Sequence, residues 1–409
     1  MKILLINTSD IRGGAAIAAF RLMNALNANG QQAKMMVREK LSDNDNVVQV
    51  GGNLANRWNF LAERTRIFAH NRFSRKNLFD VSIADRGLSV VNHPLFRDAD
   101  VIHLHWINQG MLSLKEIGRI IASGKKVVWT MHDMWPFTGI CHHAAGCDHY
   151  ESSCGRCPYL AAPSQKDLSH ECFRIKQNTY AHGKITFVAC SHWLKELAEK
   201  SPLTRGHHLL SIPNPIDTTR YRPMDKKEMR DRLGLPQEKK LLLFAAAKAS
   251  DSRKGIRYLA EASQILAAQR NDIHMLIAGS QAEEMLKQLA LPATALGYVK
   301  PEDMPALYNA ADLYVTPSLL ENLPNTIMEA MACGTPCVGF NTGGIPEMID
   351  HRENGYVARY RDATDLAEGI VWSLGESVWS DLSQSASAKT TMHYDASVVV
   401  YQYIDTYHA

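Results

Sequence analysis

The stretch Glu321–Glu347, which reads ENLPNTIMEAMACGTPCVGFNTGGIPE, decides the fold of this chain of 409 residues. Just before it, residues 312–316 (DLYVT) form a short, β-rich run that is typical of a buried strand. Within it, apolar residues at helical spacing end at Gly334, and residues 337–340 (CVGF) predict the next buried parallel strand. The order strand, loop, helix, strand predicts an open α/β sheet, which binds ligands at the carboxyl ends of its strands.

Two carboxylates stand eight positions apart in this stretch, Glu321 in the loop and Glu329 in the helix. Asn325 and Thr326 are typical of a helix N-cap, and the backbone N–H groups at a helix start can hold phosphate oxygens. Carboxylates beside such a site can accept hydrogen bonds from sugar hydroxyls. Spacing alone favours a plainer interpretation, two solvated glutamates near a helix start, where negative charge is stabilising.

The full string resembles the E-x7-E signature of retaining glycosyltransferases of family 4, and the resemblance continues through ACGTPCV and GGIPE. It implies the α/β GT-B fold, in which two Rossmann-like doubly wound domains face a central cleft. It also implies a nucleotide-diphosphate sugar donor, GDP- or UDP-linked, and no catalytic metal. On this resemblance Glu329 holds the ribose, while Glu321 and the backbone of Asn322 and Leu323 hold the sugar and the phosphates.

Composition sets the broad class of the protein. The chain is longer than one ordinary domain and suits two α/β domains, and a hydrophobic content of 45% allows a sizeable core. A net charge of +3 does not indicate a nucleic-acid-binding protein. The apolar run at the start of the sequence is too short for a signal peptide, and no apolar run approaches transmembrane length. We therefore expect a cytoplasmic protein whose eight cysteines are thiols or metal ligands rather than disulfides.

A glycine pair marks the start of the first predicted domain. Residues 2–7 predict a strand and residues 17–26 a helix, and Gly13 and Gly14 between them let a substrate approach the backbone closely. The pair does not form the GxGxxG pattern of dinucleotide-binding folds, so a nicotinamide cofactor is not favoured. In the family resemblance this pair matches the glycine loop near the donor phosphates and the acceptor.

A histidine follows another predicted strand. Residues 126–131 (KVVWTM) run directly into His132 and Asp133. A lone histidine is usually structural. The string TMHDMWPFTGIC, however, is similar to the version of the family found among bacterial surface-polysaccharide transferases. That resemblance places His132 beside the donor sugar, where it positions the sugar rather than acting as a general base.

Four cysteines follow this histidine at close spacing: Cys141, Cys147, Cys154 and Cys157. Four thiolates so close together can form a tetrahedral structural zinc site, and the alternative is a loop with free thiols. Four cysteines leave no open coordination position, so a zinc ion there would brace the loop after His132 and take no part in chemistry.

Residues 57–76 are basic with interleaved aromatics, and only Glu63 opposes the charge. Such a segment can lie on an anionic membrane surface. Its alternative is an ordinary helix with a buried aromatic face and a solvated basic face. Family members that act on lipid-linked acceptors often dock by the N-terminal domain, so the resemblance slightly favours peripheral contact with the cytoplasmic membrane face.

The domain boundary is expected near the segment 209–223, which resembles the interdomain linker of the family. We therefore assign residues 1–208 to the acceptor-side domain and residues 209–393 to the nucleotide-sugar-binding domain. As in other GT-B enzymes, we expect a C-terminal helix of about 394–409 to pack back on the first domain.

Two lysines of the second domain stand between an apolar strand and a helix, which is a typical place for a diphosphate. Lys254 matches the lysine of the family directly. Lys248 stands where many members carry arginine, and it keeps the charge without the bidentate fork. Gly279 follows the next strand, and Val299 lies in a segment that resembles the one whose backbone contacts the nucleotide base.

Together these features predict a retaining glycosyltransferase that moves a sugar to a glycan or lipid-linked glycan acceptor in cell-surface polysaccharide or lipopolysaccharide biosynthesis. His132, Lys254 and Glu321 are the residues nearest the chemistry. Two alternatives stay open: a GT-B-fold sugar-nucleotide epimerase, which would turn over donor without an acceptor, and a nucleotide-sugar-binding protein without transfer activity. A zinc-dependent hydrolase or deaminase is not favoured, because no H-x-E precedes the C-x-x-C.

Overall fold

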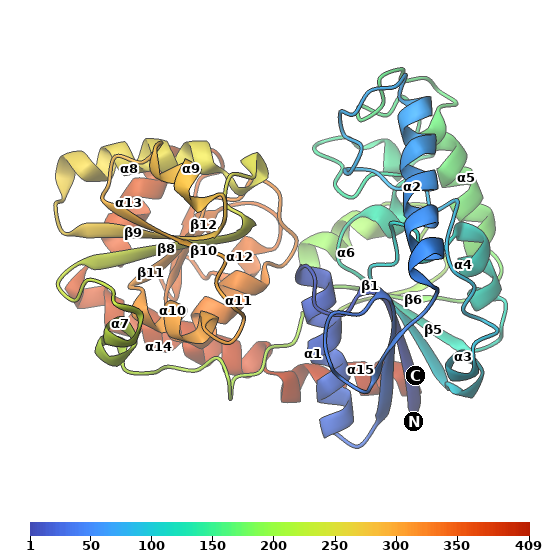
Figure 1. Cartoon of the computed structure of the whole chain (residues 1–409), viewed down its shortest axis with the longest axis horizontal. Helices are drawn as coiled ribbons and strands as arrows, with labels where there is room; N and C mark the ends of the chain where they lie inside the picture. The colour runs from blue at the N-terminus through green and yellow to red at the C-terminus, as the bar shows by residue number, and fades with distance from the viewer. The chain divides into compact units, whose positions relative to one another are not determined.

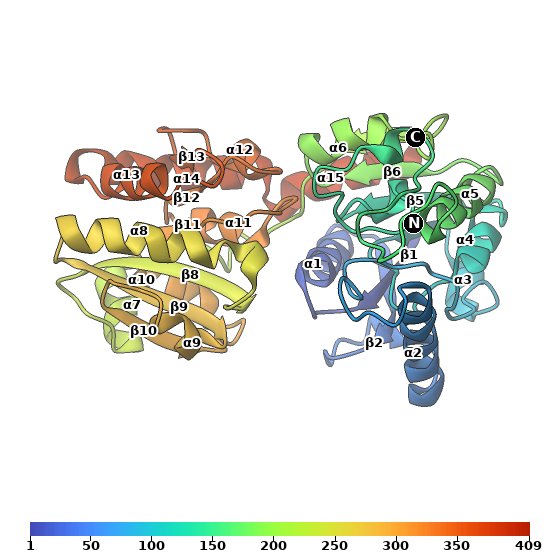
Figure 2. The same ribbon diagram turned by 90° about the horizontal axis from the view of Figure 1, so that it is seen from above.

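The computed structural model describes all 409 residues. It divides the chain into two compact units, Met1–Pro213 with Val400–Ala409, and Asn214–Val399. Each unit contains one sheet whose paired strands are all parallel, with helices on both faces (Figures 1 and 2). The predicted α/β fold with two Rossmann-like domains is confirmed.

The first unit has a seven-stranded sheet in the order β3-β2-β1-β4-β5-β6-β7. The strand order reverses between β1 and β4, and open α/β sheets bind ligands at such a switch point. The strands are β1 (Lys2–Ser9), β2 (Gln32–Glu39), β3 (Val47–Gln49), β4 (Val101–Leu104), β5 (Lys126–Met131), β6 (Thr186–Ala189) and β7 (His208–Ser211). The helices are α1 (Gly14–Ala28), α2 (Asn53–His70), α3 (Pro94–Asp98), α4 (Leu114–Ile121), α5 (Leu168–Tyr180) and α6 (His192–Glu199), and two short 3-10 turns are η1 (Trp135–Phe137) and η2 (His149–Glu151).

A continuous apolar core fixes the first sheet against its helices. Trp129 of β5 is fully buried, and its ring centroid lies 5.8 Å from those of both Tyr180 and Phe187. His103 of β4 and Thr130 of the neighbouring strand β5 form hydrogen bonds with two tyrosines of the C-terminal helix α15 (Ala396–His408). The end of the chain is thereby part of this unit.

The second unit has a six-stranded sheet in the order β10-β9-β8-β11-β12-β13, which reverses between β8 and β11. Helices α8 and α13 cover one face, and α7, α10, α11 and α14 the other (Figure 1). The strands are β8 (Lys240–Lys248), β9 (Ile273–Ser280), β10 (Ala293–Gly297), β11 (Leu313–Thr316), β12 (Cys337–Phe340) and β13 (Gly355–Ala358). The helices are α7 (Lys226–Leu233), α8 (Ile256–Gln269), α9 (Ala282–Leu286), α10 (Met304–Ala310), α11 (Asn325–Ala332), α12 (Ile345–Met348), α13 (Ala363–Ser373) and α14 (Glu376–His393), with one 3-10 turn, η3 (Ser252–Lys254).

Most expected elements of the central stretch are present, with shifts at their ends. Gly334 follows α11 with a φ of +72°, as expected for a helix stop. The N-cap of α11 is Pro324, and no side chain caps this helix, so the expected cap at Asn325 and Thr326 is wrong. Strand β7 belongs to the first sheet, although the sequence placed residues from 209 onward in the second domain. No helix combines the length and the apolar character needed to cross a membrane.

Candidate functional site

In the second unit, the loops after β8 and β11 bring two predicted site residues together. Lys254 Nζ forms an ion pair with Glu321 Oε1. The local fold explains this contact. Gly255 has a φ of +73°, and a Cβ there would lie 1.7 Å from the carbonyl oxygen of Pro317, so only glycine lets the two loops pack. These loops follow the two strands that flank the switch point, where a ligand is expected.

A third loop packs on the same place from β12. Gly343 has a φ of +58°, and a Cβ there would lie 1.8 Å from the carbonyl oxygen of Glu321. The N–H of Gly344 donates to the carbonyl of Asn322 at 2.7 Å. The GG turn is thus required for the position of the loop that carries Glu321 and Asn322. Leu323, the third loop residue predicted for this site, is buried.

Glu329 lies on α11 and is almost fully buried. Its Oε2 accepts a hydrogen bond of 2.9 Å from the hydroxyl of Tyr308. Burial raises the pKa of Tyr308 well above its usual value, which keeps this hydroxyl a neutral donor. The carboxylate is therefore held in one orientation close to the start of a helix that has no side-chain cap.

The other predicted donor-site residues also lie at the carboxyl end of this sheet, but they take no part in the ion pair between Lys254 and Glu321. Lys248 ends β8 with an exposed side chain and makes no ion pair. Gly279 has a φ of +129°, and a Cβ there would lie 1.9 Å from the carbonyl oxygen of Ala246, so glycine is required where β9 passes β8. Val299 lies just beyond β10 and is half-buried.

His132 of the first unit is half-buried and lies in a row of imidazoles with the buried His105 and His103. Its Nε2 lies 3.1 Å from Nδ1 of His105, and its Nδ1 lies 3.6 Å from Sγ of Cys190. His103 Nδ1 lies 2.7 Å from the hydroxyl of Tyr407, and its Nε2 lies 2.8 Å from Oγ1 of Thr130. Burial lowers the pKa of His132 to about 4. At neutral pH this imidazole is uncharged, so it can orient a ligand by a hydrogen bond but cannot offer a positive charge.

The residue after His132 anchors a second network. Asp133 Oδ2 accepts from the indole of Trp106 at 2.7 Å and lies 2.7 Å from Nδ1 of His142. His142 Nε2 lies 3.1 Å from Oγ of Ser82, which completes a serine–histidine–aspartate arrangement. Ser82 is 0% exposed, so no substrate reaches its hydroxyl and a hydrolytic role is excluded. The network fixes the indole of Trp106.

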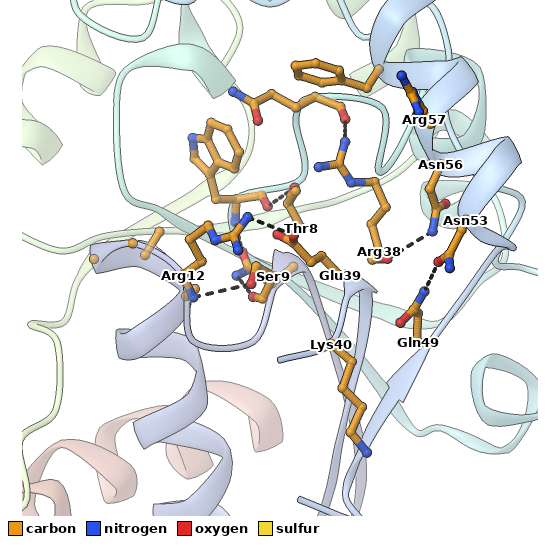
Figure 3. A pocket seen from close by; sticks show the side chains of 18 residues that line it. Thr8, Ser9, Arg12, Arg38, Glu39, Lys40, Gln49, Asn53, Asn56 and Arg57 are labelled. Atoms are coloured by element: carbon orange, nitrogen blue, oxygen red, sulfur yellow. Dashed lines mark hydrogen bonds and ion pairs between the residues drawn. The ribbon is translucent and has the colours of Figure 1, made fainter. Parts of the chain in front are cut away.

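Trp106 lines a cavity of the first unit that has a volume of about 690 Å³ (Figure 3). The predicted glycines, Gly13 and Gly14, line it, and Gly13 has a φ of +92° just before α1. The sequence did not single out most of its other residues, among them Arg38 and Gln109. The cavity lies at the carboxyl ends of β1, β2 and β4, which is the switch point of this sheet.

The four cysteines after His132 line one small cavity together, along with His149 and Tyr150. All eight cysteines of the chain are free thiols in the structure. Nowhere in the chain do three or more histidine, cysteine, aspartate or glutamate side chains converge so that they could hold a metal ion. The structural zinc site stays a prediction, which the metal content of the purified protein tests.

Comparison with known proteins identifies the class of the chain. A family model described as Glycosyltransferase Family 4 matches residues 12–220, and one described as Glycosyl transferases group 1 matches residues 239–376. An uncharacterized glycosyltransferase of Methanocaldococcus jannaschii is 31% identical over 68% of this chain and 74% of its own length. N-acetyl-alpha-D-glucosaminyl L-malate synthase of Bacillus anthracis is 26% identical over 64% of this chain and 73% of its own length.

Solved structures share the fold along the whole chain. Sucrose-phosphate synthase of Thermosynechococcus elongatus has a TM-score of 0.70 at 17% identity and covers 99% of this chain and 98% of its own. The Anabaena protein HepE in complex with UDP and glucose has a TM-score of 0.64 at 18% identity, with 99% of both chains covered. The fold is therefore that of the GT-B glycosyltransferases. Because the first family model spans half of the sequence, the chain belongs to glycosyltransferase family 4 and is a glycosyltransferase.

Proposed function

We propose that this enzyme transfers a sugar, with retention of configuration, from a nucleotide-diphosphate sugar to a glycan or lipid-linked glycan in cell-surface polysaccharide biosynthesis. The observation that carries the proposal is the contact between Lys254 and Glu321 at the switch point of the second sheet, next to the uncapped start of α11. A cation, a carboxylate and the positive end of a helix dipole together suit a diphosphate with a sugar attached.

The roles of the three donor-site residues follow from their chemistry. Lys254 would leave Glu321 for the diphosphate, where its charge stabilises the leaving group as negative charge develops in the transition state. Glu321, released from the lysine, would accept hydrogen bonds from sugar hydroxyls. Glu329, fixed by Tyr308, would accept them from the ribose. His132, uncharged at neutral pH, would orient the sugar by a hydrogen bond.

The names of similar proteins support the donor and the pathway. Structures of HepE contain UDP or UDP-glucose. An O-antigen chain mannosyltransferase of Escherichia coli and a putative teichuronic acid biosynthesis glycosyltransferase of Bacillus subtilis are among the relatives. We extend to this chain a UDP- or GDP-linked donor and an acceptor of the cell-surface polysaccharide class.

The exposed face of α2 supports a membrane-bound acceptor. Leu54, Trp58 and Leu61 are 87%, 66% and 45% exposed and follow one another at helical spacing, so they form one apolar stripe. Past the helix, Phe73 is also 73% exposed, which favours the membrane interpretation over that of a buried aromatic face. The same segment carries exposed arginines. We propose that this stripe rests on an anionic lipid bilayer.

Thermal unfolding in the presence of nucleoside diphosphates tests the donor site. UDP or GDP should raise the unfolding midpoint of the wild type, because a ligand that binds the folded state stabilises it. Glu329→Ala should abolish that rise. A wild-type midpoint that no nucleoside diphosphate moves would contradict the proposal. Release of nucleotide from a sugar donor without any acceptor, accompanied by an altered sugar, would point instead to the epimerase.

A further inference from the structure

The cavity of the first unit has the size of a sugar site and an arginine-rich wall. Clefts of about 300–1,000 Å³ take small ligands, and this cavity of about 690 Å³ falls within that range. Arginines reach it from three places: Arg12 from the loop after β1, Arg38 from β2 and Arg57 from α2 (Figure 3). Lys40 is also part of the wall, but its side chain runs away from the three arginines (Figure 3).

Glu39 is the one carboxylate among the residues that line the cavity. Glu39 Oε1 lies 2.8 Å from Nη1 of Arg12, so this pair is already neutral. No carboxylate pairs with Arg38 or Arg57. The charged residues of the wall are Arg12, Arg38, Lys40 and Arg57 against Glu39, so the cavity carries an excess of three positive charges. Two of these belong to Arg38 and Arg57, which form no ion pair.

Arg38 is held in place by its neighbours. Its Nη1 donates to the carbonyl of Gln109, and its guanidinium lies 5.5 Å from the centroid of the Phe60 ring. The side chain is half-buried, and burial lowers its pKa. A desolvated guanidinium in a fixed orientation binds an oxyanion more strongly than a mobile surface arginine does, because less solvation and less side-chain freedom are lost on binding.

The rest of the wall suits a carbohydrate. Phe60 and Trp106 present aromatic surface, and the indole of Trp106 is fixed by its bond to Asp133. Amide side chains that can bond to hydroxyl groups line the same cavity: Gln49, Asn53 and Gln109. A few placed polar groups beside apolar surface are typical of sites that fix the orientation of a small ligand.

We infer that this cavity is the acceptor site and that the acceptor is anionic: a sugar or polyol with a phosphate or carboxylate group that Arg38 and Arg57 bind. The assignment of this ligand as the sugar acceptor rests on the proposed function, in which the bound molecule receives the sugar. The anion-binding site itself rests on the charges and contacts of the first unit alone.

The test measures the binding of three monosaccharides to the full chain by calorimetric titration: glucose 6-phosphate, glucuronic acid and glucose. Glucose 6-phosphate, glucuronic acid or both should bind about tenfold more tightly than glucose, the factor expected for one charged hydrogen bond. Which of the two binds better decides between phosphate and carboxylate. Added salt should weaken the preference, since a cleft open to solvent is screened.

Matched variants locate the preference. Arg57→Ala should reduce the affinity for the anionic sugar about tenfold and leave that for glucose unchanged. Arg57 is exposed, so its loss does not endanger folding, and Arg38→Gln serves as the second variant. Lys34→Ala is the control, because Lys34 lies on the same strand as Arg38, is exposed and does not line the cavity.

Three results would overturn the inference: equal binding of the three sugars, no binding of any of them at millimolar concentration, or equal losses in Arg57→Ala and Lys34→Ala. Titration with UDP and GDP separates this inference from the proposed function. Failure of both nucleotides to bind the wild type would contradict the donor site and leave the anion preference to be judged on its own.

Discussion

Substitution of Gly255 by alanine tests how the loop that carries Lys254 is held. This glycine combines a left-handed backbone with a close approach to another loop, since a Cβ would lie 1.7 Å from the carbonyl oxygen of Pro317. Gly234, which follows α7, is the matched control in the same unit. Its φ is +64° against +73° for Gly255, but nothing lies within 4 Å of a Cβ built there.

The magnitudes follow from these two differences. Placing alanine at a left-handed position costs about 1 kcal/mol relative to glycine, and this cost applies to both sites. At Gly255 the added methyl group forces the loops apart, which costs a further ~1–3 kcal/mol. The same movement strains the hydrogen bond of 2.8 Å from the N–H of Leu319 to the carbonyl of Arg253, worth about 1 kcal/mol. We expect Gly255→Ala to lower the free energy of unfolding by about 3–5 kcal/mol and Gly234→Ala by about 1 kcal/mol.

The assay is urea unfolding, monitored by hydrogen–deuterium exchange in peptides from Asn214–Val399. The first unit then does not contribute to the signal. Gly255→Ala should also lose sugar transfer beyond what its stability explains, because Lys254 is displaced from Glu321. Equal destabilisation by the two substitutions would refute the reasoning, since it would mean that the contact with Pro317 carries no free energy.

Three further predictions concern other parts of the chain. Tyr308→Phe should cost about 1–2 kcal/mol of stability and weaken donor binding, because the buried carboxylate of Glu329 loses its donor; urea unfolding and nucleotide titration measure the two effects. The free energy of unfolding should fall as the pH drops below 6.5, because burial lowers the pKa of His103 to about 3 and the unfolded chain then binds more protons. His103→Gln should flatten that decline, and a decline of unchanged slope would contradict the assignment. Trp58→Ser should reduce flotation with anionic vesicles, whereas Tyr401→Ser, at an exposed tyrosine of α15, should not.

The fold and the donor side could be predicted from local sequence. The sequence around Glu321 and Gly343 determines the local turns, because a side chain at Gly343 would collide with the carbonyl oxygen of Glu321. Lys254 lies 67 positions from Glu321, but each residue follows a strand that the sequence predicts. The sequence therefore predicts that both lie at the carboxyl end of the sheet. Their direct ion pair was not predicted.

The arginine-rich cavity could not be predicted in this way. Arg38 and Gln109 are 71 positions apart and meet only because β2, β1 and β4 lie side by side, an order that no local pattern reveals. The sequence identifies Arg57 as part of a basic stretch. The periodicity of that stretch does not predict which face of the helix packs against the rest of the unit. The polar residues that follow these strands were the signal that was missed.

The most direct test of the central claim is the turnover of Lys254→Ala, compared with its affinity for the donor nucleotide. Removing a group that stabilises developing charge lowers turnover by about a hundredfold in well-studied sites. We expect a loss of that order in Lys254→Ala, with a smaller loss in nucleotide affinity, because the charge on the leaving diphosphate is greatest in the transition state. Unchanged turnover in Lys254→Ala would show that the diphosphate does not leave from the site that Lys254 and Glu321 define.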